Sequence, residues 1–214
     1  MKTRDLTYKA LLGLLFAAFP LLAATQELAR VVKPEIRVGD SWTYRSTNVF
    51  APGTHEHEIR VSYADAKAIL AVSTRKSDGK EFDSSWTPEW NAVTSYTGFV
   101  YRPHSGLLRF PLRIGDTYEV KFEFLRPREN TILNTNTGTA KVVGWDMVSV
   151  PAGTFRAIKV VIETVTSQVD GSRAGQPQFT FWYAPEVRRW VKLQVVGPKF
   201  PISEELLAYK LNED

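Results

Sequence analysis

The sequence feature that most constrains this chain is a turn followed at once by a strand: VPAGTF at Val150–Phe155, then AIKVVIETV at Ala157–Val165. Proline presets φ at a central position of a tight turn, and glycine accepts the positive φ that other residues resist. In the following segment, Ile158, Val160 and Ile162 recur with the period of two expected of a pleated strand with one buried face. The unit therefore predicts a β-hairpin.

A second motif, WYAPEVRRWVK at Trp182–Lys192, ends one strand and begins another. Ala184-Pro185 interrupts the ladder, because proline has no N–H and a fixed φ. Trp190 then resumes the extended pattern. We predict that the two motifs face each other across one long hairpin and that both are structural.

Together these motifs resemble the TapB-like family of secreted bacterial β-rich domains, which have no established biochemical activity. The likeness runs loosely from Pro34 to Leu211 and is specific only in the two motifs. It implies a β-rich fold and export. The pair Arg188-Arg189 departs from the family pattern, in which a smaller turn residue is expected, so we expect this turn to be built differently.

Turn-forming residues punctuate the whole chain, which has 13 glycines and 12 prolines in 214 residues. This spacing of about nine residues is typical of an all-β fold. We predict a mostly antiparallel all-β protein, a strongly curved sheet or an open half-barrel, with long hairpin ends at 126–136 and 167–177 and a tight turn at Asp78-Gly79. The predicted strands are 41–49, 55–63, 67–75, 92–102, 118–124, 138–144, 157–165, 178–183, 189–196 and 204–211.

One pattern occurs twice: IRVGDSW at Ile36–Trp42 and LRIGDTY at Leu112–Tyr118, 76 residues apart. In each copy Gly-Asp supplies a turn and the aromatic residue opens a strand that faces the core. Two interpretations stay open: one strand-entry turn used twice, or a duplication that gives two similar sub-lobes, 34–110 and 111–214.

Residues 1–24 have the pattern of a secretory signal peptide, with a basic front, an apolar run at 10–22 and small residues at Ala23 and Ala24. The run is shorter than the roughly 20 residues of a membrane-spanning helix, so we predict cleavage near Ala24, the alternative being an uncleaved anchor. This leaves a single β-rich domain, 25–214, in the periplasm or secreted, most simply from a Gram-negative bacterium.

Composition excludes several classes of function. The chain has no cysteine, which removes disulfides, thiolate chemistry and cysteine metal sites. The net charge is +4 for the full chain and about +2 without residues 1–24, which is too small to predict nucleic-acid binding, because a polyanion is normally bound by basic residues clustered on one face.

No catalytic residue, metal site or cofactor is predicted. His55 and His57 would share one face of a strand, but their spacing of two is not the spacing of four in a zincin helix, and the face continues with apolar residues. There is no G-x-S-x-G elbow, and no two carboxylates can be paired from sequence. We therefore predict a protein that is not an enzyme.

The aromatic loop WTPEW sets Trp86 and Trp90 around a proline. A tryptophan pair in a loop either caps the core or stacks on a ligand. We take these two residues as candidate ligand-binding residues. The leading functional hypothesis is non-catalytic binding of a hydrophobic or amphipathic ligand, such as a lipid, in the bacterial cell envelope. The alternatives are a carbohydrate-binding module or one that binds an envelope protein partner, and a hydrolase of envelope polymers.

Overall fold

The computed structural model describes residues 30–48, 51–126, 129–197 and 201–213. The predicted signal peptide, residues 1–24, lies outside this range. Among the described residues, no helix is long and apolar enough to cross a membrane.

The regular secondary structure of the described chain consists of strands and one short 3-10 turn. In chain order they are β1 (Arg30–Val31), β2 (Ser41–Asn48), β3 (Ala51–Ala64), β4 (Ile69–Arg75), β5 (Glu81–Trp86), β6 (Ala92–Thr94), β7 (Val100–Arg102), β8 (Leu112–Arg113), β9 (Thr117–Arg126), β10 (Thr131–Val150), β11 (Gly153–Gln168), β12 (Arg173–Gly175), β13 (Gln178–Ala184), η1 (Pro185–Val187), β14 (Arg189–Val196) and β15 (Ile202–Lys210).

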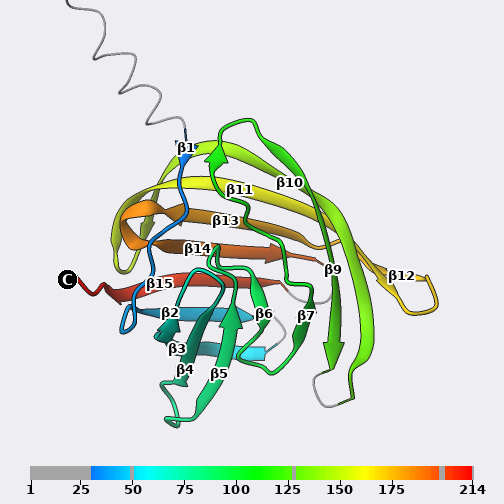
Figure 1. Cartoon of the computed structure of the whole chain (residues 1–214), viewed down its shortest axis with the longest axis horizontal. Helices are drawn as coiled ribbons and strands as arrows, with labels where there is room; N and C mark the ends of the chain where they lie inside the picture. Colours follow the sequence, from blue (N-terminus) through cyan, green and yellow to red (C-terminus); the bar gives the residue numbers. More distant parts are fainter. Residues whose placement is uncertain (1–29, 49–50, 127–128, 198–200, 214) are drawn as a thin grey trace, which may run out of the picture.

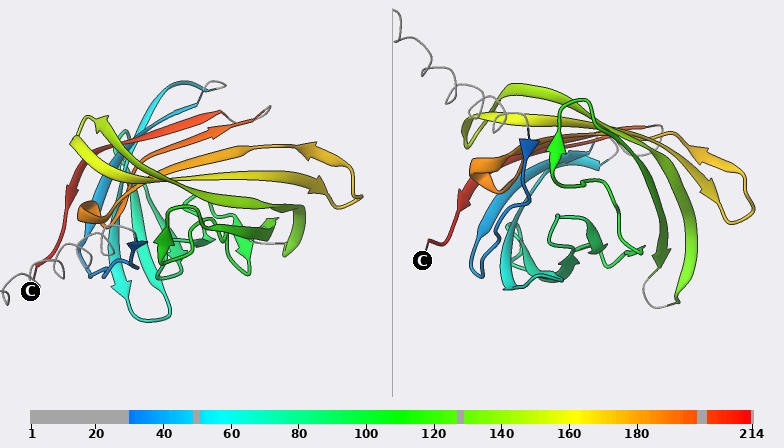
Figure 2. Two further views of the ribbon diagram at one scale, coloured as in Figure 1. Left: turned by 90° about the horizontal axis from the view of Figure 1, so that it is seen from above. Right: turned by 45° about the horizontal axis from the view of Figure 1, so that its top comes forward.

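Twelve of the described strands form one antiparallel meander that returns to its start (Figure 1). It runs from β2 to β7, continues through β9, β10, β11, β13, β14 and β15, and β15 pairs with β2 from Ile202↔Asn48 to Lys210↔Ser41. The predicted all-β, antiparallel, strongly curved sheet is confirmed, and the sheet closes on itself. In both views of Figure 2, the chain between β6 and β8 lies beneath the arch of β10 and β11.

Alternation of side chains explains this curvature. In β9, Tyr118, Val120 and Phe122 are buried and the residues between them are exposed. Each strand therefore has an apolar face that must be covered, and closing the sheet covers it with the apolar faces of the other strands.

The ring is thinnest at β6 and β7, where Thr94↔Val100 is the pair that joins them. The segment predicted as one strand at 92–102 is instead two short strands, because Gly98, with φ 83°, turns the chain between them. The prediction of a long hairpin end at 126–136 is also wrong for most of its length, since the β9–β10 ladder continues to Thr131↔Arg126.

The turn between β10 and β11 lies where the first motif predicts it. Pro151-Ala152 forms the tight turn between β10 and β11, with Val150 opposite Gly153, whose φ is 140°. Strand β11 pairs with the end of β13 from Ile158↔Tyr183 onward, so the two motifs lie at the same end of this strand pair, but no residue of VPAGTF pairs with the second motif in the described chain. Arg188 has a left-handed φ of 59°, the conformation for which a smaller residue was expected.

The two Gly-Asp turns have the same main-chain frame. At the first, Gly39 N–H donates to Val61 C=O and Val61 N–H donates back to Asp40 C=O. At the second, Gly115 and Asp116 make the same two bonds with Val142. The repeated sequence therefore folds into a repeated local structure, each copy opening a hairpin of the meander.

Candidate functional site

The structure brings Trp86 and Trp90 together, with ring centroids 5.7 Å apart. Trp86 ends β5 and is half-buried, whereas Trp90 is only 2% exposed. The main chain of Trp90 has a left-handed φ of 62°, and its N–H bonds back to Thr87 C=O. This turn folds the loop back so that the Trp90 indole enters the core.

Behind this loop lies a buried arginine in a cage of aromatic rings. Arg189, the first residue of β14, is fully buried, and its guanidinium carbon lies 3.9 Å from the Trp90 ring centre and 4.0 Å from that of Trp190. Three further rings of the described chain complete the cage, at 5.1 Å for Trp86, 5.4 Å for Trp42 and 5.7 Å for Tyr44. Aromatic faces attract a cation electrostatically, most strongly where water is absent.

The polar atoms of three of the ring side chains donate to main-chain carbonyls. The indole N–H groups of Trp42 and Trp90 donate to the carbonyls of Val187 and Arg188, at 2.8 and 3.0 Å, and the Tyr44 hydroxyl donates to Trp190 C=O at 2.6 Å. These bonds fix the rings with their faces available to Arg189. The guanidinium nitrogens, in turn, have no hydrogen-bond partner among the described residues. Contact with ring faces is thus the arrangement that holds this charge.

A buried carboxylate lies beside the cage. Glu204 of β15 is 8% exposed, accepts the Trp190 indole N–H at 2.9 Å, and has an oxygen 3.5 Å from His57 Nε2. Burial lowers the pKa of Arg189, while nearby Tyr44 and Glu204 oppose that change. Arginine remains charged at neutral pH even so, and Glu204 supplies the compensating charge.

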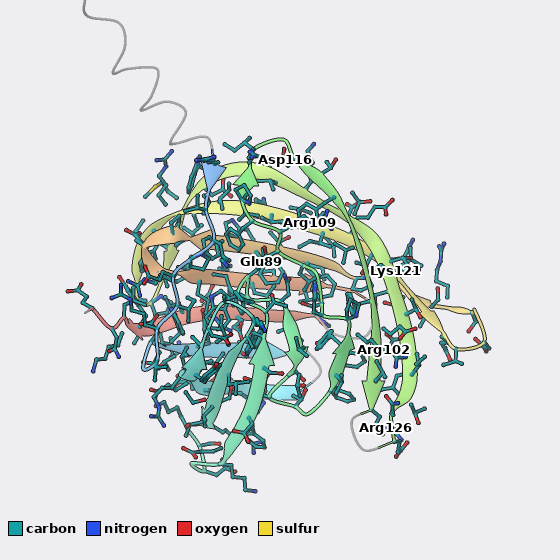
Figure 3. The ribbon with its side chains drawn as sticks, in the orientation of Figure 1. Glu89, Arg102, Arg109, Asp116, Lys121 and Arg126 are labelled. Atoms are coloured by element: carbon teal, nitrogen blue, oxygen red, sulfur yellow. The ribbon has the colours of Figure 1, made fainter. Side chains whose placement is uncertain are left out.

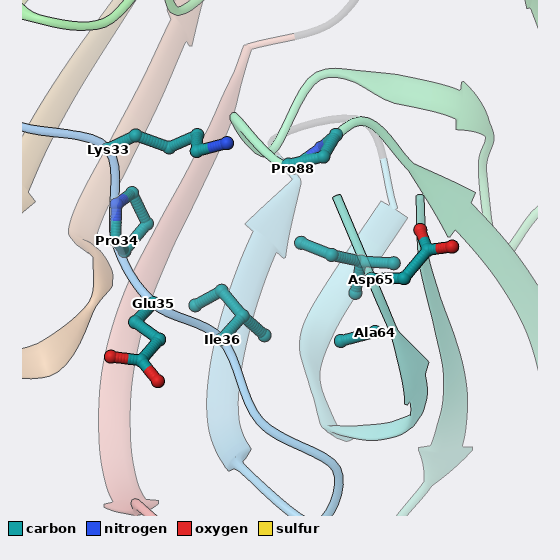
Figure 4. Close-up of a pocket in the computed structure, with 8 residues that line it drawn as sticks. Lys33, Pro34, Glu35, Ile36, Ala64, Asp65 and Pro88 are labelled. Carbon is teal, nitrogen blue, oxygen red and sulfur yellow. The ribbon is translucent and has the colours of Figure 1, made fainter. Parts of the chain in front are cut away.

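An open pocket of about 310 Å³ lies beside Pro88 of the WTPEW loop (Figure 4). It lies between the segment before β2, the β3–β4 turn and Pro88 of the loop. Its lining residues are Lys33, Pro34, Glu35, Ile36, Ala64, Asp65, Ile69 and Pro88.

The pocket has an apolar floor and a charged rim. Ile69 is buried and Ile36 half-buried, and both pack with the main core. In Figure 4, Lys33 extends toward Pro88 while the Glu35 carboxylate is directed away from the pocket. Hydrogen bonds from the main-chain N–H groups of Lys67 and Ala68 lower the pKa of Asp65, so this rim carboxylate is ionised at neutral pH.

The two histidines of β3 differ in solvent exposure. His57 is buried between Tyr44 and Tyr96, with ring centroids 5.9 and 5.2 Å away, whereas His55 is exposed. Tyr96 keeps 38% of its surface exposed, yet burial, with a smaller contribution from Glu204, raises its pKa to about 12. Tyr96 lies in the turn between β6 and β7.

Sequence reasoning identified the tryptophan loop but missed Arg189 and Glu204. The one available signal was the departure at Arg188-Arg189, where two long cations stand at a tight turn. Consecutive residues point to opposite faces, so the two side chains have different surroundings. Arg189 is buried in the interior, whereas the Arg188 guanidinium lies 3.3 Å from the Asp40 carboxylate.

No known family model matches this sequence, and no curated protein matches it. Solved structures do share its fold. A predicted lipoprotein from Parabacteroides distasonis is 12% identical, with a TM-score of 0.52 over 84% of this chain and 99% of that one. A predicted exported protein with a YmcC-like fold from Bacteroides fragilis is 14% identical, with a TM-score of 0.53 over the same shares. The chain therefore has the fold of these uncharacterised bacterial proteins.

Proposed function

We propose that this is an exported, non-catalytic protein of the bacterial cell envelope, which binds the apolar part of a hydrophobic or amphipathic ligand in the pocket beside the WTPEW loop. The observation that carries the proposal is the pocket itself: an apolar floor at Ile36 and Ile69 within a rim of Lys33 and Asp65. Such a surface suits a molecule with one apolar and one polar end.

The size of the pocket narrows the ligand class. Ligand sites of drug-sized molecules span roughly 300–1,000 Å³, and about 310 Å³ lies at the lower limit. We therefore propose a single-chain amphiphile, such as a fatty acid or a lysophospholipid, rather than a whole two-chain phospholipid.

In this proposal the two tryptophans have different roles. Trp86, half-buried at the end of β5, does not line the pocket and packs beside Arg189, and Trp90 holds the loop through its bond to Arg188 C=O. The pocket touches the same loop through Pro88.

Export is supported by the signal-like residues 1–24 and by the description of the Bacteroides fragilis protein as exported. Membership of the TapB-like family is part of the proposal and rests on the motifs VPAGTF and WYAPEV. The absence of catalysis is supported by the burial of the one described histidine–carboxylate pair, His57 and Glu204, whose Nε2 atom has no accessible surface.

Binding is tested with a dansyl-labelled long-chain fatty acid, by energy transfer from the protein's tryptophans. We expect saturable transfer that unlabelled lysophospholipid abolishes. Ile36→Glu, which places a charge on the pocket floor, should weaken binding at least tenfold. The matched control is Val38→Glu, because Val38 is on the same segment but is 53% exposed and does not line the pocket.

A second variant, Ala64→Phe, fills the pocket without adding charge and should also weaken binding. Circular dichroism and melting temperature establish that each variant folds. Equal binding by Ile36→Glu, Ala64→Phe and the parent would overturn the pocket as the site. Competition by soluble oligosaccharides alone would favour the carbohydrate-binding alternative, and release of a cleaved envelope polymer would favour the hydrolase.

A further inference from the structure

Strand β9 is paired along its whole length on one side only. Its ladder with β10 extends from Thr131↔Arg126 to Lys141↔Thr117. On the other side, β7 covers only residues 123–125. Within the described chain, no strand pairs with Thr117–Phe122 on that side.

In the first half of the molecule, the corresponding strand edge is paired. Its equivalent strand, β2, is covered by β15 up to Lys210↔Ser41. The chain then continues to Asn212, whose N–H donates to the Asp40 carboxylate at 2.7 Å and whose side-chain amide donates to Val38 C=O at 2.6 Å. An extended segment thus runs along β2 and ends on the Gly-Asp turn.

At the second Gly-Asp turn, no segment of the described chain takes the place that Asn212 has at the first turn. The Asp116 side chain is 47% exposed, with the Arg113 guanidinium 3.9 Å away, whereas that of Asp40 is 0% exposed and has the Arg188 guanidinium at 3.3 Å. A methyl group built on Gly39 would meet the Asn212 side chain, but one built on Gly115 would meet nothing within 4 Å. Beside this turn is a pocket of about 180 Å³, lined by Arg109, Phe110, Pro111, Arg113, Asp116, Thr117, Tyr118 and Val142.

The direction of the open main-chain groups follows from one contact. The Arg109 guanidinium donates to Glu119 C=O at 3.3 Å, so the main-chain groups of Glu119 are directed toward the edge that has no partner strand, where a bound segment would replace this side-chain bond. Because both groups of a strand residue lie on one edge and alternate along the strand, Thr117 and Lys121 present theirs there too. Figure 3 shows Arg109, Asp116, Lys121 and Arg102 along this region.

We propose that the Thr117–Lys121 edge of β9 binds an extended segment of a partner polypeptide, antiparallel to β9, by strand addition. The segment takes the position that β15 takes on β2, and a main-chain N–H at its end binds the Asp116 carboxylate as the Asn212 N–H binds that of Asp40. Main-chain pairing supplies affinity in such complexes, and an uncovered strand edge is the surface that it requires. This site is independent of the proposed ligand pocket.

The internal pairing of the chain favours a different polypeptide over a second copy. The described segment that makes these contacts, from Leu206 to Asn212, is already paired with β2 of its own chain. An intramolecular pairing has the higher effective concentration, so a second copy would have to displace it.

Amide hydrogen exchange tests the uncovered edge in the unbound protein. The amides of Glu119 and Lys121 should exchange at least 100-fold faster than those of their counterparts Thr43 and Arg45 under β15. Equal protection would overturn the proposal. If that protection fell on dilution together with a dimer-to-monomer change, the occupant would be a second copy instead of a partner.

Binding itself is tested with a synthetic peptide of residues 204–213 of this chain, followed by amide chemical shifts of the ¹⁵N-labelled protein. We expect shifts at Thr117–Lys121 and slowed exchange at Glu119. Glu119→Pro removes the edge N–H and should weaken binding at least tenfold, whereas the control Glu119→Ala keeps it and should bind as the parent does. Shifts confined to other strands, no binding at millimolar peptide, or equal loss in both variants would overturn the proposal.

Discussion

The guanidinium carbon of Arg189 lies 3.9 Å from the centre of the Trp90 ring, although the two residues are 99 positions apart in the chain. Arg189 opens β14, and Trp90 belongs to the loop after β5, on the other half of the meander. Trp42, Trp86 and Trp190 contact the same cation from three strands. The cage therefore joins the two halves of the ring through its interior.

Replacing Arg189 by alanine should lower the free energy of unfolding by about 3–5 kcal/mol, because the change leaves a cavity among the rings and removes the charge that compensates buried Glu204. Urea unfolding followed by tryptophan fluorescence measures this. Arg189→Lys keeps the charge but not the flat guanidinium, so its free energy of unfolding should lie between those of the parent and the alanine variant. An alanine variant as stable as the parent would show that the cage contributes nothing.

The regular part of the fold could be predicted because it is encoded locally. The alternation of buried and exposed residues in β9 and β11 depends only on neighbouring positions of the chain. The same holds for the VPAGTF turn, whose proline and glycine set the backbone conformation locally. The closure of the ring through β15 and β2 could not, since it depends on pairing between residues far apart in the chain. The short strands β6 and β7 were also missed, because an alternating segment does not reveal where a partner strand ends.

Of the candidate site, only the WTPEW loop could be predicted from the sequence. Trp86 and Trp90 were identified because two large apolar side chains beside a proline require either burial or a ligand. The pocket was not predictable, since Ile36, Ala64 and Pro88 come from three segments that meet only in the folded chain. The inward direction of Arg189 depends in turn on the irregular β13–β14 register near Tyr183.

Gly153→Val should destabilise the protein by about 1–3 kcal/mol, because φ at this position is 140°, a region that β-branched residues avoid. Space is not the reason, since the nearest atoms that an added Cβ would meet belong to the Phe155 ring at 3.5 Å. The comparison variant is Gly144→Ala, which lies on β10 and would meet nothing within 4 Å. A melting temperature that is unchanged in Gly153→Val would contradict the strained turn.

The two Gly-Asp turns allow a matched comparison. Asp40→Ala should cost about 2–4 kcal/mol, because it leaves the N–H groups of Arg37 and Asn212 and the Arg188 guanidinium without their acceptor. Asp116→Ala, at the half-exposed equivalent, should cost less than about 1 kcal/mol. Chemical denaturation of both variants measures the difference, and similar losses would show that the main-chain frame alone stabilises each turn.

His57 should make stability depend on pH. Burial lowers its pKa from the usual 6.5, with Glu204 partly opposing this and Arg189 adding to it. Below about pH 6.5 the unfolded chain therefore binds a proton that the folded chain resists, so stability should fall as the pH falls through this range. His57→Phe keeps a ring between Tyr44 and Tyr96 and removes the titrating group.

Unfolding free energies at pH 7.5 and 5.5 should show the parent losing about 1 kcal/mol more than this variant. His55→Phe, on the same strand but exposed, should behave as the parent does, and a parent and a His57→Phe variant with parallel pH profiles would refute the assignment.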